Sequence, residues 1–101
     1  MIYCFDIDKT LCSQNTYSET TTYLADPFLD RIKKVNKLYD EGHTIIIETA
    51  RGSRTGLNWE PFTKKQLKKW GVKYHQLRTG VKIFADYYID DKAISDIDFF
   101  T

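Results

Sequence analysis

The chain has 101 residues, 42% hydrophobic and 15% aromatic, enough to bury one compact core but not the cores of two domains. A formal net charge of +1, from 15 basic and 14 acidic residues, argues against any global attraction to nucleic acid or an anionic membrane. Cys4 and Cys12 are too few for a disulfide framework and indicate free thiols in a reducing compartment. We therefore expect one cytoplasmic domain, residues 1–101, without a leader peptide or a membrane span.

The first segment is an apolar run that ends in two carboxylates. Ile2 to Phe5 lack polar alternation, which is typical of a buried strand in a parallel sheet, and Asp6 and Asp8 follow directly. Ligands of open α/β sheets bind outside the carboxyl ends of the strands. Two acids placed there repel each other unless a cation or a shared proton separates them. The sequence therefore predicts a divalent metal beside Asp6 and Asp8.

A polar loop and a helix follow. Residues 12–22 are rich in Ser, Thr, Asn and Gln without helical periodicity, so they form either a plain connector or a flap that gates the acidic pair. Asp26 and Pro27 are typical of an N-cap and a first helical position, and Gly42 of a C-terminal stop. Apolar residues recur between them at helical spacing: Phe28, Leu29, Ile32, Val35, Leu38 and Tyr39.

The second strand is predicted at His43–Glu48, where three adjacent Ile residues favour buried β-structure. Because strand, helix and strand of one βαβ unit run parallel, Thr49 and Arg51 should reach the same edge of the sheet as Asp6. A second irregular loop, Ser53–Trp59, then passes over that edge.

A shorter helix is introduced by Pro61 and Thr63, runs through Trp70 and stops at Gly71, with Leu67 facing inward. Its basic residues form a solvated face rather than a nucleic-acid track, because no stacking aromatic residues accompany them. These residues are Lys64, Lys65, Lys68 and Lys69.

Two more strands are predicted near the end of the chain. Residues 72–77 form a weaker third strand, and Asp86–Ile89 form a fourth that ends in a second acidic pair, Asp90 and Asp91. The resulting order β-α-β-α-β-β, with polar groups at strand ends, predicts an α/β sandwich around a short parallel sheet.

Four motifs in this order resemble the haloacid dehalogenase (HAD) superfamily of aspartyl phosphatases. Asp6-x-Asp8-x-Thr10 is similar to its motif I, Thr49 to the hydroxyl residue of motif II, Lys82 to the lysine of motif III, and Asp90 with Asp91 to the acidic pair of motif IV. The resemblance spans nearly the whole chain. It implies a three-layer Rossmann-like sandwich, and the short loops leave no room for a cap domain.

The resemblance also implies roles. Asp6 would attack phosphorus and Asp8 would act as general acid and base, with Thr49 and Lys82 completing the catalytic set. Mg²⁺ would be held by oxygens of four aspartates, Asp6, Asp8, Asp90 and Asp91. Thr10, as part of motif I, would contact the phosphorylated substrate. Arg51 is not a superfamily-wide residue, but its position directly after Thr49 suits a bidentate contact to the phosphate or to a substrate acid.

Longer stretches resemble a narrower group of small bacterial HAD phosphatases associated with capsular and lipopolysaccharide biosynthesis. They include residues 38–47 and 49–52, Trp70 to Tyr74 and Tyr88 to Ile94. The resemblance implies a Mg²⁺-dependent phosphatase acting on a small sugar or polysaccharide-precursor phosphate through an aspartyl-phosphate intermediate. Two departures occur: Lys9 stands where that motif usually has Gly, and Ile83 where Pro often follows the lysine.

Several alternatives remain open at the level of single residues. Thr10 and Thr49 are also suited to capping backbone groups, and Asp91 to capping a turn. Arg51 is equally suited to a surface ion pair. The phosphate-neutralising lysine has three alternatives to Lys82, which are Lys64, Lys65 and Lys92.

Other functions are compatible with strand-end acids, a hydroxyl and a lysine. A receiver-like phosphorylation module would need its phosphoacceptor Asp on an interior strand, where this chain has Thr49. A nucleic-acid-end or nucleotide phosphatase is the second alternative, and the near-zero net charge disfavours a polyanion track. A degenerate HAD fold that only binds is the third alternative, and such a module would not need the retained set of Asp6, Asp8, Thr49, Lys82 and Asp90.

Assembly is the last expectation. An open site and aromatic residues in the flap, Tyr17 and Tyr23, and at the C-terminus, Phe99 and Phe100, favour a homo-oligomer, a dimer or tetramer, with the flap as contact. The alternative is that these rings fold back onto their own sheet.

Overall fold

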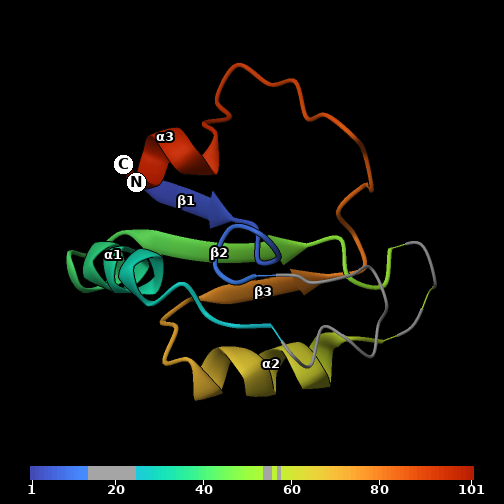
Figure 1. Cartoon of the computed structure of the whole chain (residues 1–101), viewed down its shortest axis with the longest axis horizontal. Helices are drawn as coiled ribbons and strands as arrows, with labels where there is room; N and C mark the ends of the chain where they lie inside the picture. Colours follow the sequence, from blue (N-terminus) through green and yellow to red (C-terminus); the bar gives the residue numbers. More distant parts are fainter. Residues whose placement is uncertain (14–24, 54–55, 57) are drawn as a thin grey trace.

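A computed structural model describes residues 1–13, 25–53, 56 and 58–101. Its elements in chain order are β1 (Ile2–Phe5), α1 (Leu29–Asp40), β2 (Thr44–Thr49), α2 (Glu60–Lys69), β3 (Gln76–Thr79) and α3 (Asp96–Phe100). The three strands form one parallel sheet in the order β1-β2-β3 (Figure 1). The predicted α/β class is therefore confirmed. None of the helices in the described ranges is long and apolar enough to cross a membrane.

The core lies on one face of this sheet. In the central strand β2, Ile45, Ile47 and Thr49 are buried while the residues between them are more exposed. The parallel register places Tyr3 beside Ile45 and Phe5 beside Ile47, so the inward side chains of β1 and β2 share that face. Alternation of this kind is typical of a sheet covered on one side.

The three helices cover this same face. Ile32 and Val35 of α1 and Leu67 of α2 belong to one buried cluster with the inward residues of the strands. The rings of Phe99 and Phe5 meet edge to face at 5.6 Å between centroids, which seats α3 on β1. The described elements therefore make two layers, where three were predicted. On the opposite face, side chains such as that of Cys4 lie in solvent.

The first helix begins later than predicted. Phe28, not Asp26, occupies the N-cap of α1, and no side chain caps the helix. The reason is that residues 26–28 bond to the loop after β1: Ser13 N–H donates to the Asp26 carbonyl at 2.8 Å, and Phe28 N–H donates to the Leu11 carbonyl at 2.8 Å. Backbone groups used in this extended pairing are not available for a helical turn.

The second helix starts in its predicted place, with Pro61 in its first turn, and the chain turns at Gly71 with φ of +72°. The third strand starts at Gln76, four residues later than predicted. Val72 N–H closes the end of α2 on the Leu67 carbonyl at 3.0 Å, and Lys73 N–H donates to Oδ1 of Asn36 at 2.8 Å. These residues join α2 to α1 instead of extending the sheet.

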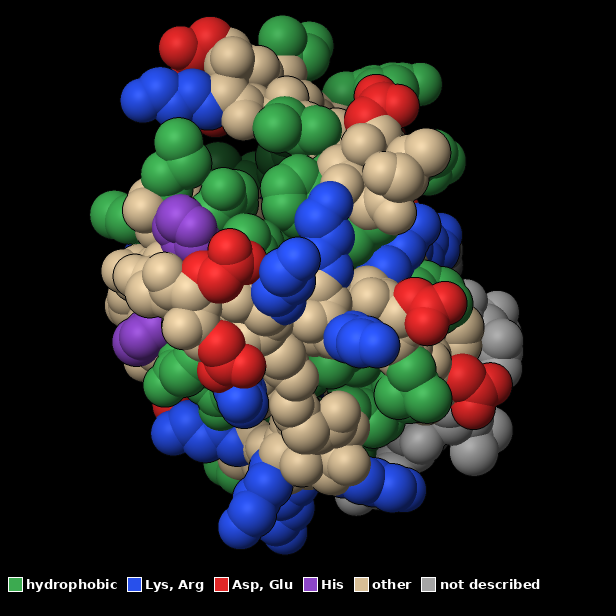
Figure 2. Space-filling model, turned by 90° about the vertical axis from the view of Figure 1, so that its left-hand side faces the viewer, with side chains coloured by type: hydrophobic (Ala, Val, Ile, Leu, Met, Phe, Trp, Pro, Cys, Tyr) green, Lys and Arg blue, Asp and Glu red, His purple; other side chains and the backbone are tan. Residues whose placement is uncertain are grey.

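The predicted fourth strand does not form. Residues 86–89 have no strand assignment, and the stretch from 81 to 95 arches away from the sheet before α3 returns to β1 (Figure 1). Its apolar side chains are exposed, with Tyr87 at 84% and Ile89 at 97%. Figure 2 shows hydrophobic side chains on both sides of a hollow in this upper part of the molecule. An apolar run becomes a strand only when a neighbouring strand pairs with it.

The expectations about assembly have mixed outcomes. Phe99 and Phe100 fold back onto their own chain, with ring centroids 5.6 and 6.0 Å from that of Phe5. This folding back is the alternative that was set against an intermolecular role. The flap residues Tyr17 and Tyr23 lie outside the described residues. A homo-oligomer therefore stays a prediction.

Truncating the core should be costly. Ile45→Ala should destabilise the protein by about 2–5 kcal/mol, because Ile45 is fully buried between β1 and β3 and its removal leaves a cavity. That is a large share of the roughly 5–15 kcal/mol by which domains of this size are stable. Urea unfolding measures the loss. Ile2→Ala, at a position 72% exposed in the neighbouring strand, should cost far less; equal losses would contradict the position of the core.

Candidate functional site

A tight loop at the end of β1 presents the acidic residues. The Ile7 carbonyl accepts the N–H groups of Thr10 at 3.1 Å and Leu11 at 2.7 Å, while the side chains of Ile7 and Leu11 are fully buried. The two apolar side chains anchor the loop in the core. Asp6 and Asp8, which flank Ile7, are therefore left half-buried at the carboxyl edge of the sheet.

Lys9 lies at the tip of this loop with φ of +67°, the sole positive φ outside glycine in the described part of the chain. The left-handed region costs an L-residue roughly 1–2 kcal/mol, which explains why Gly is usual at this position of the motif that the chain resembles. Strain of this kind is typical of functional loops. The loop tolerates it because Lys9 N–H donates to the Cys12 carbonyl at 2.8 Å.

Asp6 faces a cation and a hydroxyl. Lys82 Nζ lies 3.4 Å from Asp6 Oδ1, and the Thr10 hydroxyl donates to Oδ2 at 3.4 Å. The Asp6 side chain remains 35% exposed, so a ligand can reach it. Burial raises the pKa of Asp6 above its usual range, and the Lys82 charge opposes that rise.

Asp8 is held by a different cation. Arg51 Nη2 donates to Oδ1 at 2.7 Å and Nε donates to Oδ2 at 3.0 Å, which is a bidentate ion pair. The two carboxylates therefore have separate partners although one residue lies between them. The sequence left Arg51 open between a substrate contact and a surface ion pair, and the structure shows a buried ion pair instead.

Thr49 ends β2 and its side chain is buried. Its hydroxyl accepts the N–H of Arg51 at 3.1 Å, which is the backbone-capping alternative considered above. This bond turns the chain so that the Arg51 side chain points back toward Asp8. The phosphate contact of Thr49 stays a prediction.

Of the four candidate lysines, Lys82 is the one that the structure brings to Asp6. Ser53 donates its hydroxyl to the Lys82 carbonyl at 2.6 Å, which fixes the backbone there. Lys64 pairs instead with Glu60 in its own helix, 3.0 Å away. Lys65 and Lys92 are exposed. The ring of Tyr88 also lies 4.7 Å from Lys82 Nζ.

The second acidic pair is not part of this group. Asp90 and Asp91 are exposed, and Asp90 Oδ1 accepts the N–H of Lys92 at 2.9 Å. That bond lowers the pKa of Asp90. Across the described residues, no three acidic, His or Cys side chains come together as a metal site would need. The four predicted Mg²⁺ ligands are therefore not assembled in this conformation, and its two gathered carboxylates are balanced by protein cations.

Three polar residues near the acids were not assigned to the site from the sequence. Thr63 and Gln66 are buried on α2 and bond to Arg51. Their three-residue spacing places them on one helical face, but nothing local marked that face as facing an acid. Cys12 Sγ lies 3.7 Å from Asp8 Oδ1, and burial raises the pKa of Cys12 to about 12, so this thiol is a packing group and not a nucleophile.

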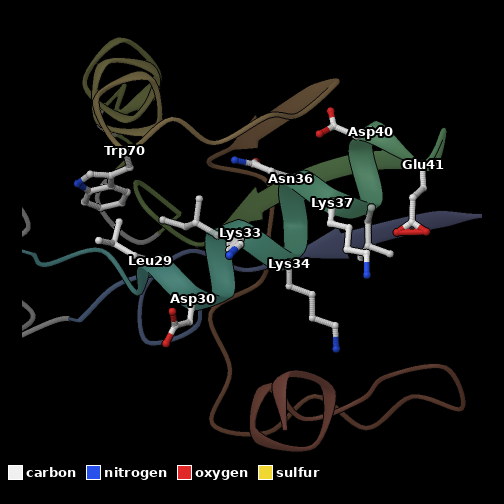
Figure 3. A pocket seen from close by; sticks show the side chains of 11 residues that line it. Leu29, Asp30, Lys33, Lys34, Asn36, Lys37, Asp40, Glu41 and Trp70 are labelled. Carbon is white, nitrogen blue, oxygen red and sulfur yellow. The ribbon is translucent and has the colours of Figure 1, made fainter.

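A shallow pocket lies elsewhere, along the outer side of α1. Leu29, Lys33 and Lys37 line it, and Trp70 closes one end (Figure 3). The acidic residues of the β1 loop are not among its lining residues, so this pocket is separate from the candidate site. The candidate site itself lies at the carboxyl edge of the sheet.

Fold and site together define a small α/β protein with two differently paired carboxylates at the carboxyl edge of a short parallel sheet. No family model matches the chain, and no curated protein matches it. The chain is similar to the crystal structure of an MCSG target from Vibrio cholerae, with 27% sequence identity and a TM-score of 0.84. The match covers 99% of this chain and 87% of that chain, so it supports the α/β fold over the whole length.

Proposed function

We propose that the protein is a phosphatase of the HAD type that hydrolyses a phosphate monoester with Asp6 as nucleophile. The observation that carries the proposal is the contrast between two neighbouring carboxylates. Asp6 is accessible and has Lys82 beside it, whereas Asp8 is fixed by a buried arginine. Carboxylates held in such different surroundings are suited to different chemical roles.

The proposed reaction has two steps. In the first, an Asp6 oxygen attacks phosphorus, the ester P–O bond breaks, and Asp8, which carries a proton at this stage, gives it to the leaving alkoxide. In the second, Asp8 takes a proton from a water molecule that attacks the phosphorus of the aspartyl phosphate, which frees Asp6 and phosphate. Lys82 lowers the repulsion between the Asp6 carboxylate and the anionic substrate.

The substrate class in this proposal is a small sugar or polysaccharide-precursor phosphate. It rests on the resemblance to capsular and lipopolysaccharide phosphatases. A panel of sugar, nucleotide and amino-alcohol phosphates separates it from the nucleotide alternative. Preferred turnover of nucleotide or oligonucleotide 3′-phosphates would overturn the sugar assignment.

Removing the lysine should weaken catalysis without unfolding the protein. Lys82→Met should lower kcat/KM by about 10²–10³-fold, because a preorganised charge that faces the developing anion is lost. Initial rates with a sugar phosphate measure the effect, and thermal unfolding checks the fold. Lys92→Met is the matched control, since Lys92 is exposed and lies in the same segment. A larger loss in Lys92→Met would mean that the assignment of the lysine is wrong.

A further inference from the structure

Arg51 makes more polar contacts than a structural ion pair needs. Its side chain is 5% exposed, and it donates four hydrogen bonds out of the five N–H groups of a guanidinium. Two go to the Asp8 carboxylate, at 2.7 and 3.0 Å. The other two leave Nη1 for Thr63 Oγ1 at 3.2 Å and Gln66 Oε1 at 2.7 Å.

This geometry argues against a direct substrate contact. A bidentate grip on phosphate uses two parallel N–H groups of the fork, and both edges of the Arg51 fork are engaged with Asp8 or with α2. Breaking the pair would leave the Asp8 carboxylate without its cation in a site that is only 16% exposed. Arg51 therefore acts on Asp8 and not on a bound anion.

The contacts with α2 fix the direction of the guanidinium plane. Thr63 and Gln66 lie one turn apart on the buried face of α2, and both side chains are buried. Thr49 holds the Arg51 backbone from the other side by accepting its N–H. The backbone and the guanidinium of Arg51 are thus both held in place, and the Asp8 carboxylate bound to the guanidinium is held in one orientation.

We propose that Arg51 is a positioning residue for proton transfer, which orients the Asp8 carboxylate toward the bond that breaks. The proposal rests on the proposed phosphatase function and assigns Arg51 a role other than substrate binding. Proton transfer is sensitive to direction, so an Asp8 carboxyl group rotated by the loss of one N–H donor gives a proton to the alkoxide, and takes one from water, less efficiently. Losing Arg51 should therefore lower kcat, and should lower it most for substrates with poor leaving groups, which depend most on protonation.

The test is a double-mutant cycle on the full-length chain with Arg51→Lys and Asp8→Asn. Arg51→Lys keeps the charge but removes the fork, and it should lower kcat for an alkyl phosphate by about 10–10²-fold with KM changed less than about twofold. The loss should be smaller for 4-nitrophenyl phosphate, whose leaving group needs little protonation. When Asp8→Asn is already present, adding Arg51→Lys should lower kcat further by less than about twofold.

A substrate-binding arginine gives the opposite pattern, which would overturn the proposal. KM would rise, the loss of kcat/KM would be equal for both substrates, and this loss would persist in the Asp8→Asn background. Arg78→Lys is the matched control, because Arg78 forms an exposed ion pair with Glu48 at 3.3 Å and should leave kcat unchanged.

A second variant covers the case in which Arg51→Lys does not fold. Thr63→Val keeps the shape of the side chain and removes one acceptor of the guanidinium, so it should lower kcat for the alkyl phosphate severalfold with KM unchanged. If Arg51→Lys does not fold, unchanged kcat in folded Thr63→Val would by itself overturn the role of Arg51. Failure of the wild type to hydrolyse any phosphate monoester would instead overturn the proposed function, and the role of Arg51 with it.

Discussion

Asp6→Asn should lower phosphatase turnover by about 10³-fold or more, because an amide does not attack phosphorus to form the acyl phosphate. The fold should survive. The pKa of Asp6 is raised in the folded protein by burial, so keeping this group ionised near neutral pH costs stability. A neutral amide removes that cost, still accepts from Thr10, and loses the Lys82 contact, which leaves a small net change.

The sign of this effect can be checked against pH. A group whose pKa is higher in the folded state contributes stability at low pH, and this contribution is lost as the pH rises through the folded pKa. The stability of the wild type relative to the Asp6→Asn variant should therefore increase only as the pH is lowered into the acid range. Initial rates and thermal unfolding at two pH values measure both effects, and Asp26→Asn, an exposed position, is the control. Turnover by purified Asp6→Asn above one tenth of the wild-type value would contradict the assignment of Asp6 as the nucleophile.

Chelation of divalent cations should abolish turnover, and adding Mg²⁺ to the metal-free protein should slow amide exchange in residues 86–91. The resemblance implies Mg²⁺, yet Asp90 and Asp91 lie apart from the other acids. They can reach Asp6 only if their segment moves. Within the described residues β1 pairs only with β2, so its other edge is open to receive a fourth strand.

Contacts at both ends of the segment tie it to the part of the molecule that carries the acids. At one end Lys82 Nζ lies beside Asp6 and over the ring of Tyr88. At the other end Asp96 pairs with Arg31 at 2.7 Å, and Arg31 also donates to the Thr10 carbonyl at 3.0 Å. Both ends therefore lie at the edge of the sheet that carries the acids. Docking would also bury the apolar side chains that the segment now exposes.

Hydrogen exchange followed by mass spectrometry measures the movement. Mg²⁺ should slow exchange in residues 86–91 and raise the midpoint of thermal unfolding, since a ligand that binds only the folded state stabilises it. Asp90→Asn should lose both responses, while NaCl at matched ionic strength should produce neither. Full activity in excess EDTA would contradict the metal requirement. Full Mg²⁺-dependent activity with unchanged exchange would contradict the movement alone.

Local patterns in the sequence were sufficient for most of the elements. The apolar run before Asp6, the three adjacent Ile residues of β2 and Pro61 in the first turn of α2 each correspond to an observed element. These signals are local, because helix periodicity, strand propensity and proline geometry act within a few residues. The parallel order of the first two strands followed from the same signals, since a helix between them requires it.

The same patterns failed where a residue's partner lies far along the chain. Residues 86–89 have the composition of a strand, but pairing with β1 is a long-range event that composition does not specify. The start of α1 moved because Leu11 and Ser13, more than ten residues earlier, bind the backbone at residues 26–28.

The sequence by itself placed Asp6, Asp8 and Thr49 at the carboxyl edge of the sheet, since each of these strand-end motifs closes or directly follows its strand in the chain. Only the tertiary structure decided how they are paired. Lys82 lies beside Asp6 and Arg51 holds Asp8, across 76 and 43 positions of sequence. An ion pair forms where folding brings two opposite charges to hydrogen-bond distance. Charged residues show no periodicity along the chain that would predict which of them will pair.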